Sequence, residues 1–286
     1  MQLGFFGDIS EPTSTKPTRL GHADIAYRDA SAILTKATGF MDTFDYTLNP
    51  YSGCSFGCSY CYAAFFNRDK QLIEDWGKWI RVKDNAVALL RKKRASSIRR
   101  KLIYCSSVTD PYQPVERKLG LTRALLEELV PHQPRLVIQT RAGLVTRDID
   151  LFQQLDAVQV NMTVTTDDEQ VRKAFEPLCP GNGTRLKAIA EVAAAGVFSV
   201  ITLTPLLPVR DPYALAQQLL ATGVQHFIVQ PFHSTKGRFV AGTREPAMQI
   251  IEEMDWTDER YREVVAVLRE ILPNVGEGKA GFAPMI

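Results

Sequence analysis

Three of the five cysteines in this chain, Cys54, Cys58 and Cys61, lie within eight residues in the segment NPYSGCSFGCSYCYA. Thiolates at the short spacing C-x3-C-x2-C are ligands for zinc or for an iron–sulfur cluster. A structural zinc ion needs four closed ligands, but the remaining cysteines, Cys105 and Cys179, are far along the chain. A cluster of four irons held by three thiolates instead keeps one iron open for an external ligand. The spacing therefore favours a 4Fe–4S cluster over zinc and over structural thiols.

The composition is that of an ordinary globular chain and excludes several classes of protein. Of 286 residues, 45% are hydrophobic and 23% are charged, a balance that disordered chains do not have. The formal net charge of +2 is too small to indicate a nucleic-acid partner by itself. An odd number of cysteines disfavours a secreted disulfide framework, and no apolar run approaches the ~20 residues of a membrane helix. Since the N-terminus does not resemble a signal peptide, we expect a cytoplasmic protein without membrane spans.

Short apolar runs alternate with segments of helical periodicity along most of the chain. The expected strands are 46–48, 102–105, 136–139, 157–164, 197–203 and 226–230. The expected helices are 119–130, 149–155, 184–195 and 213–221. Such alternation predicts βαβ units around a parallel sheet, which is either an open doubly wound sheet or an incomplete barrel. No G-x-G-x-x-G motif follows the first strand, so a dinucleotide fold is not favoured.

We divide the chain into an N-terminal arm (1–40), a core (41–235) and a C-terminal extension (236–286). The arm is expected to be irregular, and the extension to hold a helix followed by a loose end. In parallel α/β folds the functional groups lie at the carboxyl ends of the strands. The polar segments expected there are 49–61, 106–114, Arg141, 163–168, 204–208 and 230–233.

The cysteine motif, placed after a first strand, resembles that of the radical S-adenosylmethionine superfamily. Further blocks, among them SSVTDPYQPVERKLGLTR, TRAGLVTRDIDLF and TPLLPV, are similar in sequence and order to its spore photoproduct lyase-like subgroup over roughly residues 33–235. The resemblance implies a partial (β/α)6 barrel, which agrees with the number of expected strands.

The resemblance also implies cofactors, a partner and a reaction. The cofactors are a 4Fe–4S cluster on Cys54, Cys58 and Cys61 and a molecule of S-adenosylmethionine. The partner is an external one-electron donor of the flavodoxin or ferredoxin kind. The implied reaction is reductive cleavage of S-adenosylmethionine to a 5′-deoxyadenosyl radical, which takes hydrogen from an unidentified substrate.

A set of residues around S-adenosylmethionine is implied as well. In chain order they are Tyr60, Ser107, Thr109, Asp110, Arg141, Thr163, Glu176 and Arg185. Tyr60 matches an aromatic position that packs against the adenine, and Arg141 stands where the subgroup usually has a lysine, to which it is not equivalent. Arg185 is expected at the carboxylate of the cofactor, directly or through Glu176. The alternatives are a rigid turn for the segment 110–114 and a structural salt bridge for Glu176 and Arg185.

One departure from the subgroup bears on the substrate. In spore photoproduct lyase a cysteine on the second-strand loop returns a hydrogen atom to the repaired thymine, and Ser107 stands at the corresponding position here. Cys105 would share a face with Ser107 in a continuous strand and is a candidate hydrogen donor, although a buried strand cysteine is the commoner case. A basic run at 91–101 could contact phosphates, but a solvated helix end is the favoured interpretation.

Three functions are consistent with these patterns. The first is a radical S-adenosylmethionine enzyme with an unidentified substrate. The second is repair of a DNA lesion, as in spore photoproduct lyase, with the basic run as the nucleic-acid contact. The third is a non-enzymatic iron–sulfur protein. The segments TDPYQP and TRLKAI favour the first over the third, because a protein that only holds a cluster needs no cradle for a second cofactor.

Overall fold

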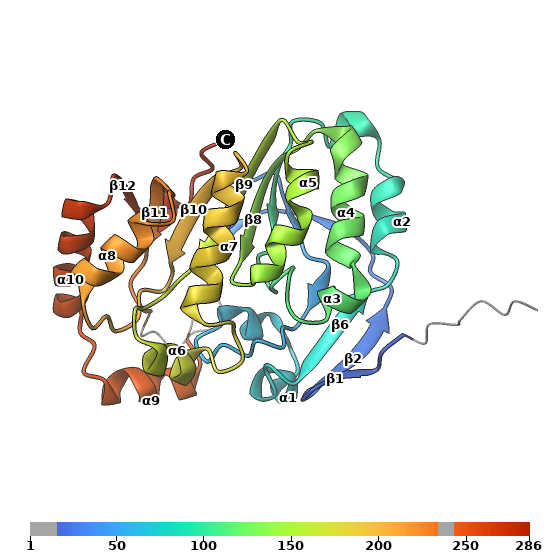
Figure 1. Ribbon diagram of the computed structural model, residues 1–286. Helices are drawn as coiled ribbons and strands as arrows, with labels where there is room; N and C mark the ends of the chain where they lie inside the picture. The colour runs from blue at the N-terminus through green and yellow to red at the C-terminus, as the bar shows by residue number, and fades with distance from the viewer. Residues whose placement is uncertain (1–15, 234–242) are drawn as a thin grey trace, which may run out of the picture.

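The computed structural model describes residues 16–233 and 243–286. Its largest element is an eight-stranded sheet, seen behind the helices in Figure 1. In order across the sheet the strands are β12 (Asn274–Glu277), β11 (His226–Val229), β10 (Phe198–Leu203), β9 (Ala157–Thr163), β8 (Arg135–Thr140), β7 (Leu102–Cys105), β4 (Tyr46–Leu48) and β3 (Leu34–Lys36). Neighbouring strands are parallel except β3, which is antiparallel to β4. Since β3 and β12 do not pair within the described residues, the sheet is an open, partial barrel.

Helices cover one face of this sheet. The helices α4 (Leu121–Leu129), α5 (Ile149–Phe152), α7 (Asn182–Ala194) and α8 (Pro212–Leu220) lie in front of the strands in Figure 1. Alternate residues of β8 point to opposite faces. Leu136 and Ile138 join the large core with the helices, whereas Val137 belongs to a separate cluster on the other face. Because the strands are parallel, their carboxyl ends meet at one edge of the sheet.

All six expected strands are confirmed, with bounds shifted by at most one residue. The expected helix at 119–130 is interrupted at Gly120, whose φ of +61° separates α3 (Glu116–Leu119) from α4. Two further short helices connect elements near the site, α1 (Lys70–Glu74) and α6 (Glu169–Phe175), and α2 (Ala86–Arg91) packs against α4. No helix in the described ranges is long and apolar enough to cross a bilayer.

A second, four-stranded sheet was not expected from the sequence. It contains β1 (Arg19–Leu20), β2 (Ala23–Arg28), β6 (Trp79–Lys83) and β5 (Tyr51–Ser52), in that order. The prediction of an irregular arm is therefore wrong for the described part of 1–40, while residues 1–15 lie outside the described ranges. The strand β2 is half exposed and short, and it exists because its backbone pairs with β6, which lies about fifty residues further along the chain.

The C-terminal extension also differs from the prediction. After the segment 234–242, which is outside the described residues, come α9 (Glu245–Glu253) and α10 (Asp258–Ile271), and α10 packs against α8. The strand β12 then pairs in parallel with β11, and α11 (Gly278–Gly281) follows. The expected loose end is thus a seventh parallel strand of the sheet. Its sequence, NVGE, carries no apolar run, so only backbone pairing with β11 reveals it.

Candidate cluster and cofactor site

The cysteine loop directly follows β5 at the carboxyl edge of the sheet. The side chains of Cys54 and Cys58 are buried, and Cys61 is partly exposed. Gly53 has a φ of +76°, and a Cβ atom there would lie 2.5 Å from Cε3 of Trp79 on β6. This close approach requires glycine, since any side chain would collide with the second sheet. The second sheet is therefore the support against which the cysteine loop is folded.

Hydrogen bonds fix the loop to the strands and helices on both sides. The Ser55 amide donates to Oε1 of Gln113 at 2.9 Å, and the Thr109 hydroxyl donates to the Gly53 carbonyl at 2.6 Å. On the other side the Ser59 amide donates to the carbonyl of Phe175, the last residue of α6, at 2.8 Å. The expected cofactor residue Thr109 thus holds the cysteine loop in place.

The three thiols lie on one short loop, and two of them are buried. No group of three or more His, Cys, Asp or Glu side chains in the described residues is placed to hold one ion. Burial raises the pKa of Cys54, and burial raises that of Cys61 to about 11. Thiols of this kind release their protons on binding a metal centre. The loop therefore carries three thiols within eight residues, and thiolates are the ligands that iron–sulfur centres use.

A buried group of charges lies beside the loop and is built around Glu176. This carboxylate is fully buried and accepts hydrogen bonds from the Tyr60 hydroxyl and from Nη2 of Arg185. Nε of Arg141 lies 3.9 Å from its Oε1 atom. Burial by itself would raise the pKa of Glu176, but the two guanidinium charges and the hydrogen bonds outweigh it, so the pKa is lowered and the group is ionised. Sequence positions 60, 141, 176 and 185 are therefore brought together as expected.

Arg185 lies behind Glu176 and has no exposed surface. Its Nε donates to the Pro180 carbonyl at 2.9 Å and its Nη1 to the Thr163 carbonyl at 3.1 Å, while Nη2 faces Glu176. Each of its three nitrogens already has a protein acceptor. We expected Arg185 to act on the cofactor either directly or through Glu176. These contacts favour action through Glu176 over direct contact with a ligand.

Arg141 is the cation of this group that has a free donor. Its side chain is 18% exposed, and its Nη2 donates to the Tyr60 hydroxyl at 3.2 Å. Its buried Nε has no hydrogen-bond partner. Buried polar atoms are nearly always satisfied, so an unpartnered guanidinium nitrogen beside the cysteine loop is a position at which a ligand could accept a hydrogen bond.

Asp110 and Ser107 shape the turn after β7. Asp110 is buried and accepts from Oγ1 of Thr140 at 2.7 Å and from the backbone amides of Arg141 and Tyr112, each at 2.9 Å. Burial raises its pKa, and the Arg141 charge and these hydrogen bonds offset that effect only in part. Its contacts are those of the rigid turn that the sequence left as an alternative.

The Ser107 segment is held in a similar way by Asn49. Oδ1 of Asn49 accepts from the Ser106 hydroxyl at 2.6 Å and from the amides of Ser107 and Val108 at 2.9 and 3.0 Å. The Ser107 carbonyl accepts from the Tyr62 hydroxyl. Asn49 follows β4 and was not expected as a site residue. Its position directly after the first expected strand could have indicated such a role.

Thr163 faces the interior of the partial barrel, within a polar network that sequence analysis missed. Nε2 of Gln139 donates to the hydroxyls of Thr163 and Thr202 at 2.7 and 2.9 Å. Oε1 of Gln139 accepts from Tyr104 and Asn161. The sequence does contain a pattern that indicates this network. Gln139, Asn161 and Thr163 are polar residues at alternate positions of two strands that otherwise contain mainly apolar residues.

Cys105 is buried and packs in the core that includes the helices, and its role as a hydrogen donor stays a prediction. The side chains of Ile103 and Cys105 belong to the core between the sheet and the helices, whereas Tyr104 points to the other face. The strand ends at Cys105 and a turn follows, so the two-residue alternation does not continue to Ser107. The commoner case, a buried strand cysteine, is the observed one.

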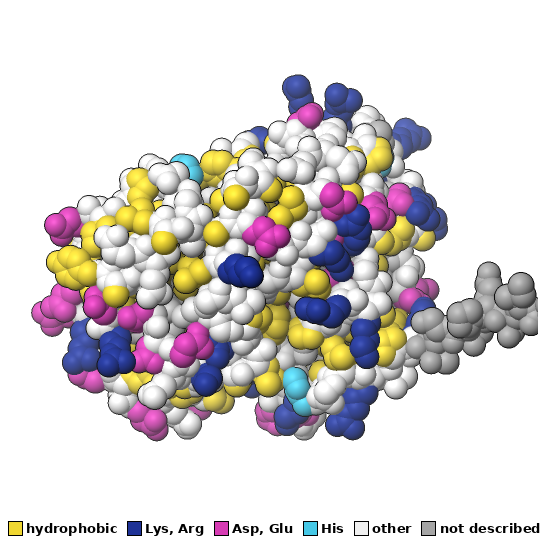
Figure 2. Space-filling view, in the orientation of Figure 1, with side chains coloured by type: hydrophobic (Ala, Val, Ile, Leu, Met, Phe, Trp, Pro, Cys, Tyr) yellow, Lys and Arg dark blue, Asp and Glu magenta, His cyan; other side chains and the backbone are white. Residues whose placement is uncertain are grey.

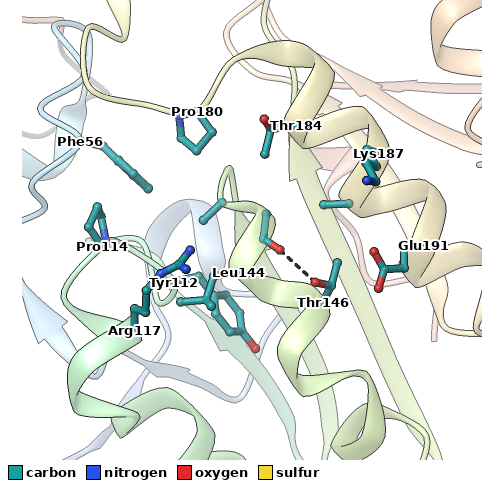
Figure 3. A pocket seen from close by; sticks show the side chains of 13 residues that line it. Phe56, Tyr112, Pro114, Arg117, Leu144, Thr146, Pro180, Thr184, Lys187 and Glu191 are labelled. Carbon is teal, nitrogen blue, oxygen red and sulfur yellow. Dashed lines mark hydrogen bonds between the residues drawn. The ribbon is translucent and has the colours of Figure 1, made fainter.

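One groove lies outside the barrel, on the helix side, and has a volume of about 310 Å³. Figure 3 shows Phe56 of the cysteine loop and Pro180 and Thr184 at the start of α7 on its border. Arg117, Lys187 and Glu191 provide its charges. None of the three clustered cysteines and none of the four residues at 60, 141, 176 and 185 lines this groove, so it is separate from the candidate site.

The basic run at 91–101 lies at the other edge of the sheet. It connects the end of α2 to the start of β7, and its residues Arg91 to Arg94, Arg99 and Arg100 are exposed. Figure 2 shows Lys and Arg side chains along the upper edge of the molecule, above α2 and α4. The candidate site lies at the carboxyl ends of the strands, so the sheet separates it from the basic run.

The structure combines an open parallel barrel, a loop with three thiols at its carboxyl edge, and buried charges beside that loop. This combination is typical of enzymes that use an iron–sulfur cluster together with a second, polar cofactor. The family model of the radical SAM superfamily matches residues 48–213, and the chain belongs to this superfamily. Membership in this superfamily indicates an enzyme and argues against the non-enzymatic interpretation. Membership implies a 4Fe–4S cluster and S-adenosylmethionine as cofactors, together with an external electron donor.

Relatives of known sequence leave the substrate open. An uncharacterised protein of Methanocaldococcus jannaschii is 35% identical over 167 residues, which are 57% of this chain and 61% of that protein. An uncharacterised protein of Mycobacterium tuberculosis is 30% identical over 235 residues, 77% of this chain and 67% of that protein. The chain thus matches less than two thirds of the archaeal relative.

Among solved structures, a cysteine-to-serine mutant of spore photoproduct lyase has a TM-score of 0.61 and 16% identity, covering 88% of this chain and 81% of the lyase. A further mutant of that lyase, with bound AdoMet and dinucleoside spore photoproduct, has a TM-score of 0.59 and 16% identity at the same coverage. At this level of identity the likeness establishes a shared fold. It confirms the partial barrel expected from the sequence.

Proposed function

We propose that Cys54, Cys58 and Cys61 bind a 4Fe–4S cluster, and that the protein uses it to act on S-adenosylmethionine and then on a substrate yet to be identified. The chemistry that these two cofactors supply when bound is one-electron cleavage to a 5′-deoxyadenosyl radical that abstracts hydrogen. The observation that carries this proposal is the hydrogen bond from Tyr60, which lies inside the cysteine motif, to the buried Glu176. It joins the cluster ligands and the polar group into one site.

The residues of the chain bind and orient the ligand. Arg141, with its unpartnered Nε atom, is the donor for an anionic or hydroxyl group of S-adenosylmethionine. Glu176 fixes the hydroxyl of Tyr60 and, with Arg185 behind it, keeps a negative charge close to the Arg141 guanidinium. Asp110 holds the backbone amide of Arg141, and Thr109 holds the cysteine loop. The Arg141 guanidinium lies 6.0 Å from the centroid of the Tyr60 ring, so these two side chains together border the proposed site.

The electron must come from outside the chain, and a flavodoxin-like or ferredoxin-like protein is the donor that this proposal requires. We also propose the division of the chain into an arm (1–40), a barrel core (41–235) and an extension (236–286), with all site residues named above in the core. The polar interior around Gln139 and Thr163 is the surface on which a hydrogen-bonding substrate would be oriented.

Repair of DNA is supported by the shared fold with spore photoproduct lyase, but two observations argue against it. Cys105 is buried in the core that includes the helices, whereas Tyr104 belongs to a cluster on the other face of β7, which does not favour Cys105 as a hydrogen donor to the barrel interior. The exposed basic run lies at the opposite edge of the sheet from the cysteine loop. A duplex bound there would not present a base to the site.

The test is anaerobic reconstitution followed by turnover with a chemical reductant. Purified protein should hold about four irons and four sulfides, change its paramagnetic resonance spectrum when S-adenosylmethionine is added, and form 5′-deoxyadenosine and methionine. Deuterated substrate candidates, including small molecules and lesion-containing oligonucleotides, then identify the hydrogen source. Zinc in place of iron, or a loaded and reduced protein that neither binds nor cleaves S-adenosylmethionine, would overturn the proposal.

A further inference from the structure

Cys179 is not part of the three-cysteine motif, yet the fold brings it into contact with that motif. It lies in the segment between α6 and α7, 121 residues from Cys58 in the chain. The two sulfur atoms are 3.5 Å apart, and both side chains are buried, with exposed fractions of 3% and 7%. Within the described residues, which include all five cysteines, no other pair of thiols forms such a contact.

The contact is fixed from both sides. Next to Cys58, the amide and the hydroxyl of Ser59 donate to the Phe175 carbonyl at 2.8 and 3.2 Å, which ties the cysteine loop to the end of α6. Next to Cys179, Nη1 of the buried Arg172 donates to the carbonyls of Cys179 and Glu176 at 3.1 and 3.0 Å. Because the two backbones are attached to the same end of α6, the thiols stay opposed.

We propose that this thiol pair is a redox modification site, at which Cys58 and Cys179 form a disulfide in the cluster-free protein when a peroxide is present. A disulfide requires a sulfur–sulfur distance of about 2.05 Å, so the two sulfurs must approach by about 1.5 Å from their 3.5 Å separation. The two thiols already face each other, and closing this distance is the movement that the disulfide requires.

The reaction balances with hydrogen peroxide as the oxidant. One thiol of the pair loses its proton, its sulfur attacks the peroxide and becomes a sulfenic acid as the O–O bond breaks, and the departing hydroxide takes up that proton and leaves as water. The second thiol likewise loses its proton, its sulfur attacks the sulfenic sulfur, the S–S bond forms, and the departing hydroxide leaves as a second water. Two thiols and one peroxide thus give one disulfide and two waters. A dithiol reductant reverses the reaction by thiol–disulfide exchange.

The consequence rests on the proposed function, in which Cys58 is a cluster ligand. A disulfide to Cys179 occupies that ligand, so the oxidised chain cannot be loaded with iron until it is reduced. It also holds Cys58 at a reversible oxidation level, because a disulfide is not carried on to sulfinic or sulfonic acid. Cys179 is in this view a protecting partner and not a ligand of the cluster.

The test uses the full chain, freed of metal and treated with one equivalent of hydrogen peroxide before alkylation and peptide mapping. The wild-type protein should lose two of its five free thiols and yield a peptide pair that joins Cys58 to Cys179. Cys179→Ser should yield no such pair, whereas Cys105→Ser, a buried thiol with no sulfur neighbour, should behave as wild type.

Iron loading then separates this proposal from the proposed function. Oxidised wild type should take up iron only after dithiol treatment, and the reduced Cys179→Ser variant should load as fully as reduced wild type. Linkage of Cys58 to Cys54 or Cys61, or survival of all five thiols, would overturn the disulfide. Failure of every reduced protein to take up iron would instead overturn the proposed function, and the peptide map would still decide the disulfide.

Discussion

Both edges of the sheet carry clustered charged side chains. The charges are buried at one edge and exposed to solvent at the other. At the carboxyl edge Glu176 and Arg185 are fully buried and bonded to each other, and Nε of Arg141 has no hydrogen-bond partner. At the amino edge the cations of the run at 91–101 project into solvent, and Arg91 pairs with Glu128 on the surface. Buried charge costs desolvation energy unless it is paired, whereas exposed charge is hydrated and screened. The comparison indicates that mutations of the exposed charges should change stability little, whereas mutations of the buried charges should destabilise the fold.

The largest effect should come from the cysteine loop. Cys58→Ala removes one of the three proposed thiolate ligands, so the variant should lose its iron and the visible absorbance of the cluster. Cys179→Ala, which changes a neighbouring sulfur that is not a proposed ligand, should retain about four irons per chain after reduction. Iron and sulfide analysis of anaerobically reconstituted proteins measures both. Equal iron content in the two variants would show that the site is not held by the C-x3-C-x2-C motif.

Removal of one member of the buried ion pair should have the next largest effect. Arg185→Ala leaves Glu176 buried with a weaker counter-charge, and breaking a buried pair in this way costs about 3–5 kcal/mol of folding stability. Because Glu176 orients Tyr60, affinity for S-adenosylmethionine should also fall, by about tenfold to a hundredfold, while the iron content stays intact. Denaturant unfolding and cofactor titration by paramagnetic resonance are the measurements. Normal stability and normal affinity together would show that the pair is dispensable.

The pH dependence of stability should reveal the same pair. The pKa of Glu176 is lower in the folded protein than in the unfolded chain, because Arg185 and Arg141 outweigh its burial. Its contribution to stability is therefore complete above the unfolded pKa of about 4.3 and is lost as pH falls through the folded value. Unfolding free energies measured from pH 7 downwards should fall more steeply for wild type than for Glu176→Gln. Parallel curves would contradict this assignment.

Arg141→Lys tests the free donor without removing the charge. Lysine keeps a cation near Glu176 but lacks the fork of the guanidinium, so the affinity for S-adenosylmethionine should fall about tenfold, a difference of ~1.4 kcal/mol. Stability and iron content should change little. Arg117→Lys, in the groove on the helix side, is the matched control and should leave the affinity unchanged.

The smallest effect is expected at the amino edge. Replacing Arg91, Lys92, Lys93 and Arg94 by Gln removes exposed charges, so stability should change by less than about 0.5 kcal/mol per position. Affinity for DNA should remain weak and unchanged, since each real phosphate contact would add about one unit to the slope of log affinity against log salt. Tight, steeply salt-dependent binding that these substitutions abolish would revive the repair interpretation.

The sequence by itself determined the cysteine site and most of the barrel. Local patterns explain this. Three thiols in eight residues indicate a metal or iron–sulfur site, and six apolar runs with helical segments between them predict parallel βαβ units without knowledge of distant contacts. The positions of Tyr60, Arg141, Glu176 and Arg185 at one edge also follow from strand order, because parallel strands place their carboxyl ends together.

The tertiary structure decided what depends on pairing across long chain separations. The strands β2 and β12 carry little apolar signal and form because their backbones bond to β6 and β11. The burial of Arg185 behind Glu176, the direction in which Cys105 points, and the 3.5 Å contact of Cys179 with Cys58 are likewise set by packing between elements. A sequence pattern shows which residues share a strand, but only the packed fold shows which atoms meet and which of them are left without a partner.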